Sequence, residues 1–131
     1  ANQTVNDNRL PIYHTNVMMC VANNFAVICL DTIDEEEERS HVLETLQKSG
    51  KDIIEITEEQ KHHLAGNMLQ VVAKEPILVM SSSAYNSLTD QQIKEIETHC
   101  PILHSSLDTI ESCGGGSARC MMAEIFLPKI K

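Results

Sequence analysis

The stretch Asn16-Val17-Met18-Met19 decides the fold, because a related stretch, Asn67-Met68-Leu69-Gln70, recurs 51 residues later, at position 67 instead of 16. Each copy is followed by an apolar run, a segment with helical periodicity and a shorter apolar run. These segments are residues 25–30, 35–48 and 52–56 in the first copy, and residues 76–80, 89–98 and 101–103 in the second. The sequence therefore predicts an α/β protein with two strand–strand–helix–strand modules, about residues 10–57 and 60–110.

A third copy begins near the carboxyl end. Cys120-Met121-Met122 aligns with the start of both earlier copies, and we expect a closing strand over residues 118–128. Asn16, Asn67 and Cys120 then hold equivalent positions, which repeated units place side by side. The polar residues 1–9 are expected to form a flexible leader.

The composition fits one domain with an aliphatic core. Of 131 residues, 42% are hydrophobic and only 3% are aromatic. The net charge of −9 argues against nucleic acid or an anionic membrane as a partner, and no apolar segment is long enough to span a bilayer. The cysteine count is odd, and Cys20 and Cys29 lie in apolar runs. This usage favours a reduced, cytoplasmic protein.

Cys120 and His14 are the candidate catalytic pair. Cys120 follows a glycine-rich loop, and His14 lies two residues before Asn16, on the same face of an expected strand. If the modules pack around a common axis, both side chains point into one central cavity, where a thiol and an imidazole can support nucleophilic catalysis. Each residue alone also has a structural interpretation. A cysteine in an apolar strand is usually core, a single histidine is usually structural, and Asn16 and Asn67 could bind backbone groups.

Two other patterns suggest a phosphate-binding loop and a zinc site, and neither interpretation is favoured. Gly114-Gly115-Gly116-Ser117 leads into an expected strand and lacks a following lysine, which disfavours a phosphate-binding loop. The spacing of His62, His63 and His104 matches no familiar zinc site. We therefore expect no metal and no cofactor.

Three motifs together resemble a known superfamily. They are Pro-Ile-Tyr-His-Thr-Asn-Val-Met-Met at 11–19, Ala-Gly-Asn-Met-Leu-Gln at 65–70 and Gly-Gly-Gly-Ser-Ala-Arg-Cys-Met at 114–121. In this order they resemble the guanidino-group-modifying, or pentein, superfamily, and most closely its citrulline-utilisation-type hydrolases. The resemblance implies an α/β propeller of five modules around a pseudo-fivefold axis. At about fifty residues per module a whole propeller needs about 250 residues, so the chain looks like a carboxy-terminal half.

The resemblance also implies a reaction. The Cys120 thiolate attacks a guanidino or ureido carbon, and His14 protonates the departing amine and then activates water. Asn16 and Asn67 are expected to contact a small amino acid substrate. Arginine deiminases and amidinotransferases carry His-x-Asp where this chain has Asn16, and an amide favours a neutral, citrulline-like ureido group over a charged guanidinium.

Several alternatives stay open. The intact enzyme could be an arginine deiminase or an amidinotransferase. The chain could instead be a non-catalytic interaction module, whose exposed strand edges pair with the missing amino-terminal half or with another copy. Because the superfamily places acidic substrate-holding residues in that other half, we expect the isolated chain to be inactive.

Overall fold

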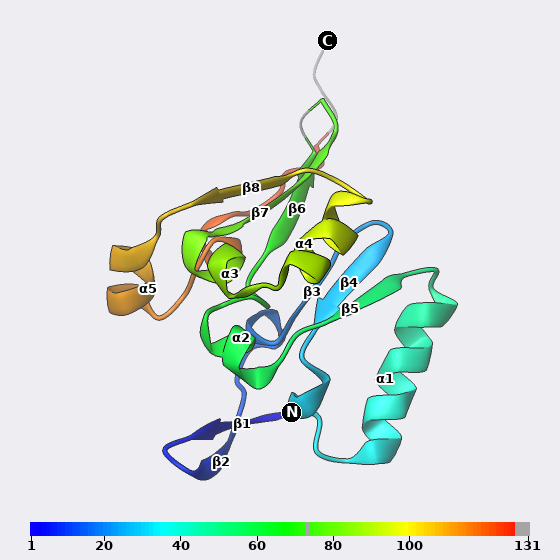
Figure 1. The fold of residues 1–131 in the computed structure, drawn as a ribbon, viewed down its shortest axis with the longest axis vertical. Coiled ribbons are helices and arrows are strands. Elements are labelled where there is room, and N and C mark those ends of the chain that lie inside the picture. The colour runs from blue at the N-terminus through cyan, green and yellow to red at the C-terminus, as the bar shows by residue number, and fades with distance from the viewer. Residues whose placement is uncertain (73, 128–131) are drawn as a thin grey trace.

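The computed structural model describes residues 1–72 and 74–127. The chain runs from a short hairpin through two three-stranded sheets to a last helix and turn (Figure 1). The hairpin pairs β1 (Asn2–Val5) with β2 (Asn8–Pro11), and Asn6 and Asp7 form its turn with φ angles of 48° and 61°. Positive φ at both central residues is typical of turns that match the twist of hairpin strands. This pairing corrects the expected leader over residues 1–9.

The first sheet has the strand order β3–β4–β5. β3 is antiparallel to β4, β4 is parallel to β5, and α1 connects the two parallel strands. The bounds are β3 Met19–Val21, β4 Phe25–Ile28, α1 Glu36–Lys48 and β5 Asp52–Glu55. Glutamates fill the first turn of α1 and a lysine lies in its last turn, an arrangement that suits the helix dipole.

The second sheet, β6–β7–β8, repeats the same order and the same strand directions. Its elements are β6 Leu69–Val72, β7 Pro76–Ser81, α3 Ser82–Ser87, α4 Asp90–Glu97 and β8 Ile102–Ser105. The short helix α2 (Glu58–His62) connects the two sheets. Two strand–strand–helix–strand units are thus present, and the second carries one helix more than predicted. Within the described residues the sheets stay separate and do not close into a barrel.

The core consists of two apolar clusters. The larger one lies between the units and contains Phe25 and Val27 from the first sheet and Met68, Leu78 and Ile96 from the second unit. The smaller one fills the space between the first sheet and α1. Burial of both sheets against a shared cluster makes the units pack as one body.

The segment around Cys120 differs from its prediction. After α5 (Asp108–Gly114), residues Arg119–Met121 form a 3-10 turn, and residues 122–127 contain no strand. A strand needs a hydrogen-bonded neighbour, and this segment pairs with none of the described strands. Ile125, Phe126 and Leu127 are accordingly about four-fifths exposed. The expected closing strand over residues 118–128 is therefore wrong for residues 118–127, and residue 128 lies outside the described residues.

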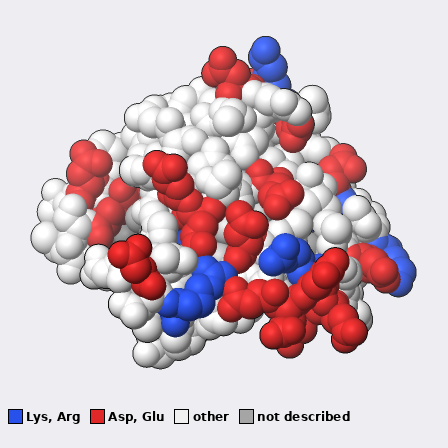
Figure 2. All heavy atoms as spheres, turned by 60° about the horizontal axis from the view of Figure 1, so that its bottom comes forward, with Lys and Arg blue, Asp and Glu red and all other residues white. Residues whose placement is uncertain are grey.

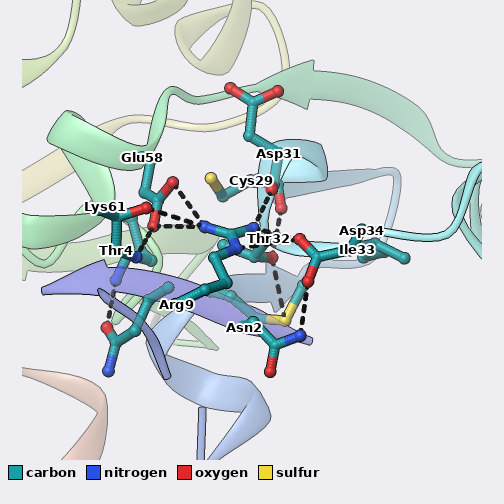
Figure 3. A network of polar contacts seen from close by, with 12 residues as sticks. Asn2, Thr4, Arg9, Cys29, Asp31, Thr32, Ile33, Asp34, Glu58 and Lys61 are labelled. Carbon is teal, nitrogen blue, oxygen red and sulfur yellow. Dashed lines mark hydrogen bonds and ion pairs between the residues drawn. The ribbon is translucent and has the colours of Figure 1, made fainter. Parts of the chain in front are cut away.

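Arg9 attaches the hairpin to the first unit (Figure 3). Its guanidinium pairs with Asp34 through Nε at 3.0 Å and with both carboxylate oxygens of Glu58 at 2.9 and 3.0 Å. Hydrogen bonds from Arg9, and then from Asn2, hold the pKa of Asp34 below its ordinary value. Burial raises the pKa of Glu58, but hydrogen bonds from the Thr4 amide and from Arg9 outweigh it and leave that pKa lowered. Among the described strands β1 and β2 pair only with each other, so these charged contacts attach the hairpin to the rest of the chain.

The face at the bottom of Figure 1, which carries the hairpin and the start of α1, is strongly acidic. Figure 2 shows that aspartate and glutamate side chains predominate on this face, with few basic ones among them. This distribution matches the net charge of −9. In the part of the chain that the structure describes, no helix has the length and apolar character needed to cross a bilayer.

Candidate functional site

A glycine-rich loop places Cys120 at the surface. Gly115 follows α5 with a φ angle of +67°, a left-handed conformation that favours glycine. A Cβ on Gly116 would lie 3.0 Å from the Cβ of Cys120 and 3.2 Å from its Sγ, so the loop backbone packs directly against the cysteine. Ser117 is buried and donates to Glu111 at 2.6 Å. The loop therefore fixes where the 3-10 turn starts and leaves the thiol exposed.

Asn67 connects three parts of the chain at this point. Its side chain is 1% exposed. Nδ2 donates to the backbone oxygen of Asn16 at 3.0 Å and to Cys120 Sγ at 3.1 Å, and Oδ1 accepts from the Arg119 amide at 3.1 Å. One buried amide thus binds the turns that carry Asn16 and Cys120.

Gly66 makes this position of Asn67 possible. A Cβ on Gly66 would lie 2.8 Å from the backbone carbon of Met18 and 3.0 Å from the Met19 nitrogen, and nearer still to the Val17 oxygen. No real Cβ fits so close to backbone atoms, so only glycine allows the start of β6 to pack on the start of β3. The side chain of Gln70 accepts from the Asn23 amide at 2.8 Å and adds a second link between the sheets.

Asn16 and His14 lie on the turn that precedes β3. This is a 3-10 turn, Thr15–Val17, rather than the expected strand start, and His14 is the residue before it. Asn16 is half-buried, and its Nδ2 lies 3.7 Å from Cys120 Sγ. The Asn16 Oδ1 is buried and has no hydrogen-bond partner among the described residues. The His14 side chain is exposed, and within the described chain its ring makes no hydrogen bond.

The structure therefore brings together three of the four predicted site residues, Asn16, Asn67 and Cys120. A family model described as N,N-dimethylarginine dimethylhydrolase, eukaryotic, matches residues 1–127. The chain belongs to this family. The dimethylarginine dimethylhydrolases are guanidino-modifying enzymes, so the superfamily expected from the three sequence motifs is confirmed.

A solved structure with a similar fold is the apo form of ArgZ, an arginine dihydrolase from the ornithine-ammonia cycle in cyanobacteria. The TM-score is 0.60 at 17% sequence identity, and the match covers 82% of this chain and 15% of the ArgZ chain. At this identity the likeness shows the fold alone. The chain thus spans a small part of the length of ArgZ. A comparison with curated protein sequences found no match.

The five thiols of this dimethylarginine dimethylhydrolase family member fall into two groups. Cys20, Cys29 and Cys100 are buried, as predicted for the first two, and Cys113 and Cys120 are exposed. Burial raises the pKa of Cys20 and of Cys29 to about 11. All five thiols are free. A reagent that reacts with thiolates therefore meets only Cys113 and Cys120 in the folded chain.

Sequence reasoning missed two features of the site. It placed Asn67 at the right position but did not detect that Gly66 is required there, although a glycine directly before the repeated asparagine was a usable signal. It also gave no role to Arg119, whose backbone amide donates to Asn67 Oδ1 from the turn at Cys120. Among residues 1–72 and 74–127, no group of three or more His, Cys, Asp or Glu side chains could hold a metal ion.

Proposed function

We propose that this chain is the Cys-bearing part of a hydrolase that acts on the guanidino or ureido group of an arginine- or citrulline-like amino acid. The observation that carries the proposal is the convergence of two asparagine amides on an exposed cysteine sulfur. Membership of the dimethylarginine dimethylhydrolase family supports a methylated guanidino group as the first substrate to test. Asn16 in place of an aspartate supports a neutral ureido group as the second.

In the proposed reaction Cys120 is the nucleophile and His14 the general acid and base. The Cys120 thiolate forms an S–C bond to the guanidino carbon, and a C–N bond of that carbon breaks as His14 protonates the departing nitrogen. Water then returns a proton to His14 and adds its oxygen to the same carbon, and cleavage of the S–C bond releases the thiolate. An imidazole suits both steps because histidines ionise near neutral pH.

The position of His14 supports this role without a direct contact. His14 immediately precedes the turn whose Asn16 Nδ2 lies 3.7 Å from Cys120 Sγ, and its side chain is exposed next to that turn. Asn16 is half-buried, and its Oδ1 has no partner among the described residues, so the side chain keeps an acceptor for a hydrogen bond from a substrate nitrogen. We assign Asn16 to substrate contact for this reason.

The proposed enzyme is completed by further modules of a five-module propeller. The described residues form two units, and the exposed Ile125, Phe126 and Leu127 are an apolar segment that another module could cover. Acidic groups that hold the substrate would come from the remaining modules. We therefore propose that the isolated chain hydrolyses neither substrate, and that its five free thiols suit the reducing cytoplasm.

The experiment labels the Cys113→Ser chain with a thiol-reactive amidine and locates the label by peptide mass spectrometry. We expect modification of Cys120 alone, and labelling that is about tenfold slower in His14→Ala, because the imidazole acts as the base. His41→Ala is the matched control, since His41 is an exposed histidine on α1. Labelling that ignores His14, or that spreads equally over several cysteines, would contradict the catalytic pair and favour a non-catalytic interaction module.

A further inference from the structure

We propose that Asn67 is a positioning residue whose side-chain amide holds the sulfur of Cys120 and stabilises its thiolate form, an inference that rests on the proposed role of Cys120 as nucleophile. This differs from the expected role of Asn67 in substrate binding. A side chain that is 1% exposed, with both Nδ2 hydrogens and Oδ1 engaged within the chain, has nothing to offer a substrate.

The hydrogen-bond network fixes which way the Asn67 amide faces. In the reverse orientation Oδ1 would face the backbone oxygen of Asn16, and the NH₂ group would face the amide hydrogen of Arg119. Both contacts would then join like partners, acceptor to acceptor and donor to donor. The observed orientation satisfies both backbone groups, so the N–H donor must face the sulfur.

A donor fixed in this way favours the charged form of the cysteine. A thiolate accepts a hydrogen bond far better than a neutral thiol, and a bond to the charged form of a group lowers the free energy of ionisation. The ionisation itself transfers the Sγ proton to water or to an imidazole and leaves the electron pair on sulfur. The Nδ2–Sγ distance is 3.1 Å for Asn67 against 3.7 Å for Asn16, so Asn67 supplies the stronger contact.

A second amide–sulfur contact in the chain provides a matched control. The Gln70 side chain donates from Nε2 to Cys100 Sγ at 3.4 Å. Gln70→Glu therefore makes the same change of charge as Asn67→Asp, at a comparable contact with a different cysteine. Cys100 is buried, and so is not the thiol that an external reagent reaches first.

The experiment measures the rate of Cys120 alkylation by iodoacetamide as a function of pH in the Cys113→Ser chain. Peptide mass spectrometry follows the modified residue. In Asn67→Asp the side chain keeps an acceptor for the Arg119 amide but loses the donor to sulfur. We expect the midpoint of its pH–rate profile to rise by about one pH unit, and that of Asn67→Ala to rise as well. Gln70→Glu should leave the Cys120 midpoint unchanged.

A variant that fails to fold would not test the proposal, and the buried thiols provide a check of folding in the same experiment. Continued protection of Cys20 and Cys29 from alkylation reports that each variant is folded. An unchanged midpoint in folded Asn67→Asp, or an equal rise in Gln70→Glu, would overturn the proposal. An Asn67-dependent midpoint together with amidine labelling that ignores His14 would contradict the proposed reaction alone.

Discussion

Asn16 and Asn67 occupy the same position in two copies of the repeat, yet they are used differently. Asn67 is 1% exposed and its polar side-chain atoms all have partners within the chain. Asn16 is half-buried, makes a longer contact with the cysteine sulfur, and keeps a side-chain oxygen, Oδ1, that has no partner in the part of the chain that the structure describes. The repeat thus determines where an asparagine lies, and the neighbours determine what it does.

The difference follows from order along the chain. Three equivalent positions, 16, 67 and 120, lie next to one another, and the middle one contacts both of its neighbours. The outer positions contact Asn67 closely and approach each other only at the longer distance of 3.7 Å between Asn16 Nδ2 and Cys120 Sγ. The middle residue can therefore be fully satisfied inside the chain, while an outer residue retains bonding capacity for a substrate.

The most severe way to disturb this comparison is Gly66→Ala. The added Cβ would overlap the backbone of residues 17 and 18, which cannot move like a flexible side chain. We expect a loss of about 3 kcal/mol or more in the free energy of unfolding, measured by urea denaturation. Gly114→Ala is the control, because a Cβ there would meet only the Ile110 side chain at 4.0 Å. A Gly66→Ala chain as stable as the parent would show that the two strand starts can separate freely.

The second test compares the two asparagines directly. Asn67→Ala removes three hydrogen bonds and leaves a partly buried backbone oxygen of Asn16 and amide of Arg119 without this partner, so we expect a loss of about 2–3 kcal/mol in the free energy of unfolding. Asn16→Ala removes one long contact and an unpaired oxygen, so its effect should stay within about 0.5 kcal/mol. Urea titrations of both variants measure the difference. Equal losses would mean that the two asparagines contribute equally to the free energy of unfolding.

The sequence predicted the positions of the two asparagines better than it predicted the secondary structure at residues 1–9 and 118–127. A repeated apolar pattern predicts the two strand–strand–helix–strand units and the convergence of Asn16, Asn67 and Cys120. This pattern can be read along the chain without knowing which strands pair. The expected strand at Cys120 is wrong because apolar residues alone do not supply the neighbouring strand that pairing requires. Residues 1–9 were misjudged by their polarity, although Asn6-Asp7 between two short segments is a recognisable hairpin turn.

The third and smallest expected loss of stability comes from the ion pairs of Arg9, on the side of the molecule that carries Asn16. The hairpin leads into the turn of His14 and Asn16, and Arg9 attaches it to Asp34 and Glu58 (Figure 3). Because both carboxyl groups have lowered pKa values in the folded chain, their contribution to stability is complete above their ordinary values of 3.8 and 4.5. It is lost as the pH falls below those values, when the unfolded chain binds protons more readily than the folded one.

Arg9→Ala should therefore destabilise the chain at pH 7 by less than Asn67→Ala does, since these ion pairs are partly exposed. The difference between parent and variant should shrink as the pH is lowered from 5 to 3, because protonation removes the same contacts. Urea denaturation across this pH range measures it. Lys48→Ala, which breaks a largely exposed pair with Glu44, is the control and should have almost no effect. A difference that stays constant with pH would mean that Arg9 acts through packing, and that charge does not hold the turn of Asn16.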